Sequence, residues 1–239
     1  MILRIGTAGW SIPREVAGQV PGEGTHLQRY AARLNATEIN SSFHRPHRPS
    51  TYARWAEAVP EDFRFAVKLP KTITHKARLV ECEGLLAAFA AEIAGLGAKR
   101  GPLLVQLPPS FAYPGAVAER FFDAVAGSLG GQVVVEPRHA SWYTPEVDAM
   151  LAARRIARVM ADPPVPVAAS EPGGWRGLTY IRLHGAPRVY YSSYEPPFLR
   201  DLAARIAGLR AGGGEVWTVF DNTASGAALG NALGLLELL

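Results

Sequence analysis

Residues 63–68 read Phe63-Arg64-Phe65-Ala66-Val67-Lys68, and the alternation within this stretch decides the fold. Side chains of a strand point alternately to its two faces, so the large apolar residues of the stretch share one face. Phe65 and Val67 are then expected to pack under helices, whereas Lys68 points to the opposite face at the end of the strand. In a barrel that opposite face is the axis, so the stretch predicts a barrel strand with a polar end.

Similar strand-like runs occur eight times along the chain, and most are followed by an amphipathic helical pattern. Apolar residues at positions 85, 86, 89, 93 and 96, and at 199, 202, 206 and 209, form single stripes that can face a sheet. The predicted strands are residues 2–6, 36–39, 63–68, 103–107, 132–136, 157–161, 178–183 and 215–220. Eight alternating units predict an α/β fold, namely a single TIM-like (β/α)8 barrel over residues 1–239.

The sixth βα unit is predicted to be irregular. Four prolines and the Gly173-Gly174 pair between Asp162 and Gly177 leave little room for a helix, so a long ordered loop is expected there. An open Rossmann-type sheet is the alternative fold, but no G-x-G-x-x-G follows the first strand.

Two helix starts have a local cause in the sequence. Thr144 is expected to cap a helix that has Pro145 at its first position, and Ser50 is expected to cap the next helix after the second strand.

Composition indicates one folded domain of the soluble class. Of the 239 residues 48% are hydrophobic and 19% charged, which is enough apolar surface for a large core. The lone cysteine, Cys82, allows no internal disulfide and no thiolate metal cluster. The sequence starts without a signal-peptide pattern and has no apolar run long enough for a bilayer, so we expect a cytoplasmic protein without a membrane partner. The net charge of +4 is spread along the chain, which makes nucleic acid a possible but less favoured partner.

Polar residues gather at the axis-side ends of the predicted strands. By alternation these residues are Glu38, Asn40, Lys68, Gln106, Glu136, Tyr180, Arg182 and His184, with Arg138 and His139 in the loop after Glu136. Burying so many polar groups costs several kcal/mol unless each finds a partner. Glu136 with Arg182, or Glu38 with Lys68, can therefore be structural ion pairs beneath a site. Active sites of such barrels are nevertheless built from several strand ends at one face.

The residue types at this face favour a metal-free pocket for an anionic or sugar-like ligand. Histidines follow several strands, but no H-E-x-x-H pair is present, and no nucleophile elbow accompanies Ser41-Ser42. Cations that can meet at one rim and bind phosphate or carboxylate are Lys68, Lys71, Arg138, Arg182 and Arg188. Aromatic residues near the same face, Trp10 among them, can stack on a sugar or a base, although most are expected to be packing residues. The sequence identifies no cofactor.

Seven ordered motifs along the chain resemble one known family. They are Gly6-Thr7-Ala8-Gly9-Trp10, Glu38-Ile39-Asn40-Ser41-Ser42-Phe43, Phe65-Ala66-Val67-Lys68 with Thr74-His75, Gln106-Leu107-Pro108-Pro109-Ser110-Phe111, Glu136-Pro137-Arg138-His139 with Ser141-Trp142, Arg182-Leu183-His184-Gly185 and Phe220-Asp221-Asn222-Thr223. Together they resemble the YecE-like family, also called domain of unknown function 72. The resemblance implies a TIM-barrel-like fold and no established activity. Unlike the family pattern, residues 12–24 lack a second Trp and an aromatic-Pro pair, and His44 replaces a common Tyr.

Three functional hypotheses follow from these residues. The first is a small-molecule enzyme or binding protein, with Glu136 as general acid or base, Lys68 and an arginine holding an anion, and His184 as proton shuttle. The expected ligand-binding residues are Trp10, Glu38, Asn40, His75, Gln106, Arg138, His139, Asp162, Arg182 and Asn222. The second is a non-catalytic nucleic-acid or protein-binding module that uses the loop 162–177. The third is metal-assisted hydrolysis by Glu38, Glu136, Asp162 and His184. The oligomeric state is not predicted.

Overall fold

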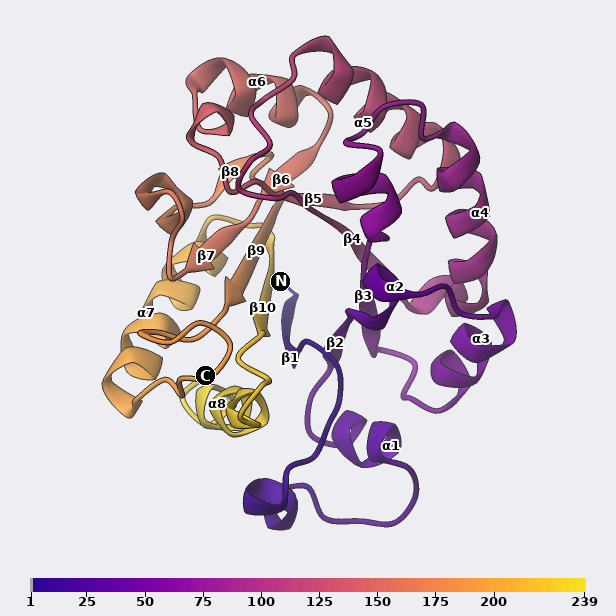
Figure 1. Ribbon diagram of the computed structural model, residues 1–239. Coiled ribbons are helices and arrows are strands. Elements are labelled where there is room, and N and C mark those ends of the chain that lie inside the picture. Colours follow the sequence, from indigo (N-terminus) through magenta and orange to yellow (C-terminus); the bar gives the residue numbers. More distant parts are fainter. Residues whose placement is uncertain (1) are drawn as a thin grey trace.

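The structure is a computed structural model that describes residues 2–239. It is an α/β fold in which strands alternate with helices, and the helices lie around the outside of the strands (Figure 1). The strands are β1 (Leu3–Thr7), β2 (Ala36–Ile39), β3 (Arg64–Lys68), β4 (Arg100–Gln106), β5 (Val133–Glu136), β6 (Ile156–Arg158), β7 (Met160–Asp162), β8 (Gly173–Gly174), β9 (Leu178–Leu183) and β10 (Glu215–Phe220). The α-helices are α1 (His26–Ala31), α2 (Ser41–His44), α3 (Pro49–Glu57), α4 (Glu83–Ile93), α5 (Ala116–Ser128), α6 (Pro145–Ala153), α7 (Pro196–Ala211) and α8 (Ala227–Leu236).

The strands form two hydrogen-bonded sheets, and residues 2–239 do not form the expected closed eight-stranded sheet. One sheet has the order β1-β10-β9-β7 and the other β2-β3-β4-β5-β6-β8, and every pair is parallel except β6 with β8. The strand expected over residues 157–161 is divided at Val159, because β6 pairs with β5 whereas β7 pairs with β9. At the other junction a single bridge between Ala8 and Glu38 connects the chain after β1 to β2.

Two apolar clusters confirm the alternation within the strands. Phe65 and Val67 belong to the larger cluster, which includes the buried faces of the helices. Ala66 belongs to a second cluster enclosed by the strands, whose other members include Leu104, Val134, Tyr180, Trp217 and Val219. Lys68 is on the same side of β3 as Ala66, so its side chain points inward, as predicted.

Local structure agrees with the sequence at two of the three positions singled out above. The side chain of Thr144 accepts a hydrogen bond from the backbone N–H of Val147 and caps α6. Residues 163–177 contain no α-helix, only a 3-10 turn at Val167–Ser170 and the short β8. The prediction for Ser50 is wrong, because α3 begins at Pro49, whose fixed φ suits a first helical position. Within residues 2–239 no helix is both long and apolar enough to cross a membrane.

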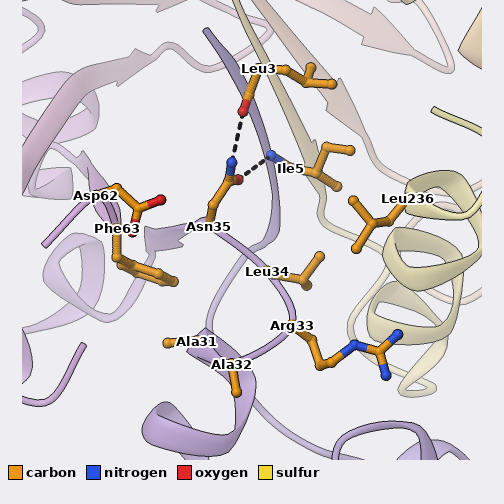
Figure 2. Close-up of a pocket in the computed structure, with 10 residues that line it drawn as sticks. All are labelled: Leu3, Ile5, Ala31, Ala32, Arg33, Leu34, Asn35, Asp62, Phe63 and Leu236. Atoms are coloured by element: carbon orange, nitrogen blue, oxygen red, sulfur yellow. Dashed lines mark hydrogen bonds between the residues drawn. The ribbon is translucent and has the colours of Figure 1, made fainter. Parts of the chain in front are cut away.

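Asn35 ties the loop after α1 to β1, at the end of the strands opposite to Lys68. Its side chain accepts a hydrogen bond from the backbone N–H of Ile5 at 3.0 Å and donates to the carbonyl oxygen of Leu3 at 2.8 Å. Figure 2 shows these bonds beside a pocket that α8 also borders through Leu236. Because the Asn35 amide is occupied by backbone groups, we assign it a structural role.

Candidate functional site

The guanidinium of Arg182 joins three carboxylates that come from three different strand ends. Its side chain has no exposed surface. Nε and Nη2 donate to the two oxygens of Glu38 at 3.1 and 2.7 Å. Nη1 donates to Glu136 at 2.6 Å, and Nη2 donates also to Asp221 at 2.9 Å. Four of the five N–H donors of this arginine are therefore used within the protein.

His184 lies between two of the same carboxylates. Its Nε2 is 2.8 Å from Glu136 Oε1, and its Nδ1 is 3.0 Å from Asp221 Oδ2. Burial alone would lower the pKa of His184, but the charge of Glu136 and the hydrogen bonds to both carboxylates raise it above its usual value. The arrangement thus favours an imidazolium that donates from both ring nitrogens.

Two carboxyls of the cluster, those of Glu136 and Asp221, are held in their ionised form. Burial alone would raise the pKa of Glu136, but Arg182, His184 and Arg138 hold it well below its usual value. The pKa of Asp221 is likewise lowered, because Arg182 and His184 outweigh the effect of burial. Tyr180 completes the set by donating its hydroxyl hydrogen to Glu38 at 2.8 Å. Because their pKa values are lowered, Glu136 and Asp221 are weak proton acceptors at neutral pH.

A cavity of about 160 Å³ opens next to this cluster. Its polar wall consists of Glu136, Arg138 and His184. The remainder is apolar and consists of Pro109, Pro137, Ala161, Pro163, Val165 and Val189. Arg138 donates from Nη2 to Glu136 at 3.2 Å, and 23% of its side chain is exposed. The Tyr190 side chain is a second hydrogen-bond partner of this guanidinium. An arginine has five N–H donors, so others remain that can bind a ligand.

Lys68 is the second cation at this end of the strands with unused donors. The residue is 9% exposed, and its Nζ lies 4.3 Å from the centre of the Phe43 ring. Among residues 2–239 the ammonium has no hydrogen-bond or ion-pair partner. Burial and the nearby charge of Arg182 lower its pKa to about 8, although the carboxylates of the cluster act in the opposite direction.

Three further predicted residues border the cluster. Asn40 donates from Nδ2 to Asp221 at 3.3 Å. Gln106 ends β4 directly beside Glu136 of β5 and is buried. The ring of His75 lies 5.0 Å from that of Phe43, on which Lys68 also packs. Burial and the charges of Lys68 and Arg138 lower the pKa of His75.

Asp162 and Asn222 are not brought to the cluster. Asp162 ends β7 on the helix side and accepts a hydrogen bond from the hydroxyl of Tyr194 at 2.8 Å. Asn222 donates to the side chain of Asn231 at 2.8 Å and to the carbonyl oxygen of Ser192 at 2.9 Å. Asp162 therefore joins the end of β7 to the loop before α7, whereas Asn222 joins the loop after β10 to α8.

His139 and Trp10 likewise have structural partners. His139 Nδ1 lies 2.9 Å from Ser141 Oγ and also accepts from the backbone N–H of Ser141, at the start of a short 3-10 helix. Trp10 packs edge-to-face on Trp55, with ring centres 5.0 Å apart. Neither residue contacts the Arg182 cluster, although Trp10 and Asn40 both line a separate, more open pocket after β1.

Asp221 belongs to the cluster but is not among the site residues expected from the sequence. The residue follows β10, and Trp217 and Val219 of that strand belong to the inner apolar cluster. Alternation therefore places Asp221 on the inner side, by the rule that identified Glu136 and Lys68.

The geometry does not suit the metal site considered for Glu38, Glu136, Asp162 and His184. Across residues 2–239 no group of three or more His, Cys, Asp and Glu side chains is arranged to hold a metal ion. The physical reason is that the Arg182 guanidinium lies between the carboxylates, and that Asp162 points away from them.

Comparison with known proteins identifies the family. The family described as "Protein of unknown function DUF72" matches residues 4–239. The chain belongs to the DUF72 family. Its expected resemblance to YecE-like proteins is thus confirmed. Curated relatives include the UPF0759 protein YecE of Escherichia coli K12, which is 32% identical over 59% of this chain and 50% of its own length, so the match spans half of that protein. The UPF0759 protein YunF of Bacillus subtilis is 22% identical and is matched over 100% of this chain and 95% of its own length.

Solved DUF72 structures share the fold of this DUF72 protein. A DUF72 family protein from Enterococcus faecalis V583 superposes with a TM-score of 0.84 at 22% identity, covering 100% of this chain and 95% of the other. One from Thermotoga maritima MSB8 gives a TM-score of 0.81, also at 22% identity, with 100% and 99% coverage. These likenesses establish an α/β fold with parallel sheets and indicate no ligand.

Proposed function

We propose that this DUF72 protein binds an anionic small molecule at the C-terminal ends of its strands, with Arg138 and Lys68 facing the ligand. The main support for the proposal is that three cations at this face use different numbers of their N–H donors within the protein. Arg182 uses four donors on carboxylates, whereas Arg138 uses one on a carboxylate and one on Tyr190. The Lys68 ammonium uses none on residues 2–239. Arg138 borders the cavity, and unused N–H donors of arginine and lysine are the groups that bind phosphate or carboxylate.

In this proposal Arg182 is a scaffold and no longer an anion-binding residue. The guanidinium fixes Glu38, Glu136 and Asp221, and Glu136 in turn orients Arg138 and His184. Glu136 then serves to position cations, because both of its oxygens are engaged and its pKa is low. His184 is left as the more suitable proton donor of the pair, since it is held as an imidazolium.

The proposal also treats the two sheets as halves of a TIM-like barrel. Two junctions support this reading: the Ala8–Glu38 bridge joins β1 to β2, and only Val159 separates β6 from β7. A barrel brings the ends of β2, β3, β5, β9 and β10 to one face, which is where ligands bind in that architecture.

Thermal unfolding in the presence of inorganic phosphate tests the proposal, because a ligand that binds only the folded state raises the unfolding midpoint. We expect a saturable rise for the wild type that is lost in Arg138→Met and Lys68→Met. Arg154→Met is the matched control, since Arg154 follows α6 and pairs with Glu119 and Asp123 of α5. An equal rise in all four proteins would refute the proposal. A response to short RNA that fades steeply with salt would instead favour a nucleic-acid-binding module.

A further inference from the structure

Lys68 has the surroundings of a reactive amine rather than those of a structural cation. A structural buried lysine has carboxylate or carbonyl partners, as Lys99 has in the carbonyl oxygens of Ala56 and Val59, both at 2.8 Å. Lys68 lies at the end of β3 with its Nζ over the Phe43 ring and has no such partner among residues 2–239. Its stem is fixed by burial among the strands, so the amine is held at one place.

The environment of Lys68 also allows the amine to lose its proton. A lysine acts as a nucleophile only when neutral, and burial or a neighbouring cation makes that form accessible. Both causes act here, since burial and Arg182 lower the pKa of Lys68 to about 8. Only 9% of the residue is exposed, which limits the access of bulk water to an imine formed on this amine.

We infer that Lys68 forms an imine with the carbonyl group of a small aldehyde or ketone that also carries an anionic group. The neutral amine attacks the carbonyl carbon, and the new C–N bond forms as the carbonyl electron pair moves to oxygen. That oxygen accepts one proton from the amine nitrogen and one from solvent and leaves as water. The product is an iminium ion on Lys68 Nζ, and no oxidant or cofactor is consumed.

The anionic group of the substrate is assigned to Arg138, and this part rests on the proposed function. Arg138 lies at the cavity beside Glu136. Only β4 lies between β3, which ends at Lys68, and β5, which ends at Glu136, two residues before Arg138. Neighbouring strands are about 4.8 Å apart, so a short molecule can place its anion at Arg138 and its carbonyl at Lys68. The substrate class is therefore a 2-oxo acid or a phosphorylated aldehyde of few carbons.

Reductive trapping with sodium cyanoborohydride tests the inference in the full-length protein. Glyoxylate is the anionic probe, and acetaldehyde is the neutral probe of similar size. Hydride adds to the iminium carbon and leaves a stable secondary amine, which peptide mass spectrometry assigns to one lysine. At neutral pH we expect glyoxylate to modify Lys68 at least about tenfold faster than the exposed Lys76, because an ordinary lysine has a pKa near 10.4.

Three variants separate the inference from the proposed function. Lys68→Met is expected to abolish the adduct, and Lys76→Met to leave it unchanged. Arg138→Met is expected to reduce trapping of glyoxylate about tenfold toward the rate of acetaldehyde, the loss expected for one charge-assisted contact. If phosphate raises the unfolding midpoint but Lys68 is trapped no faster than Lys76, the imine is refuted and the anion site stands. If Lys68 is trapped quickly by both probes and Arg138→Met changes neither rate, the imine stands and the anion site is refuted.

Discussion

Replacing Arg182 by Met removes the one group that holds three buried carboxylates together. The substitution keeps a long side chain but deletes four hydrogen bonds of 2.6–3.1 Å to Glu38, Glu136 and Asp221. Removing one partner of a buried ion pair costs about 3–5 kcal/mol, because the other charge stays buried without compensation. Three carboxylates are affected here, so we expect a loss at the upper end of that range, a large share of the roughly 5–15 kcal/mol of a typical domain.

Arg182→Met is also expected to reverse the direction in which stability changes with pH. In the wild type the pKa values of Glu136 and Asp221 are lowered, so their stabilisation is present above about pH 4 and is lost as the pH falls further. Burial is already the largest single effect on these carboxyls, and without the guanidinium it is no longer outweighed, so we expect both pKa values to rise above the unfolded ones. The variant should then become more stable as the pH falls from about 6 to 4.5, whereas the wild type should not. Below about pH 6 His184 is protonated in both states and does not contribute.

Urea unfolding at several pH values measures both effects. The matched control is Arg154→Met, which removes an arginine that also pairs with two carboxylates, Glu119 and Asp123, but at the surface. Exposed pairs contribute at most about 1 kcal/mol, so the control should lose little and show no inverted pH dependence. A loss in Arg182→Met as small as in the control would refute the reasoning. So would a variant whose stability falls with the pH in parallel with the wild type.

Three further substitutions are predicted to change stability. Because the pKa of His184 is raised, its stabilisation is complete below about pH 6.5 and fades as the pH rises through the folded value; urea midpoints of His184→Gln should lack this alkaline decline. Asn35→Ala should cost about 1–3 kcal/mol in urea unfolding, because two hydrogen bonds to the backbone of β1 are lost. Gly6→Ala should lower the thermal midpoint strongly, since a Cβ there would overlap the carbonyl oxygen of Ala36, whereas Gly18→Ala, where that space is open, should not.

Strand alternation could be predicted from the sequence because it depends on one local period. The periodicity that placed Phe65 outward also placed Lys68, Glu136 and Arg182 on the inner side, and the structure agrees. The same period, applied to the strand at 157–161, would have turned Asp162 outward, because Ala157 and Ala161 belong to the inner cluster. The expectation that Asp162 binds a ligand treats it as a loop residue, whereas it is the last residue of β7 and points outward.

The division into two sheets could not be predicted, because it depends on partners rather than on period. Residues 156–162 keep one alternation throughout, yet the chain changes its hydrogen-bonding partner from β5 to β9 across Val159. The antiparallel β8 arises in the same region from two glycines, Gly173 and Gly174, which pair with β6. Glycines carry no periodic signal, so this pairing is invisible in the pattern of apolar residues.

The sequence identifies most charged residues of the site, but it could not predict in full which carboxylate pairs with which cation. The sequence predicts ion pairs of Glu136 with Arg182 or of Glu38 with Lys68. The first is confirmed, whereas the second is wrong because Glu38 also pairs with Arg182. That pairing has a chemical consequence. Glu38, Glu136 and Asp221 supply three negative charges, which Arg182, Arg138 and a protonated His184 match. The charge of Lys68 is then unmatched by the cluster, and an anionic ligand is the simplest group that would balance it.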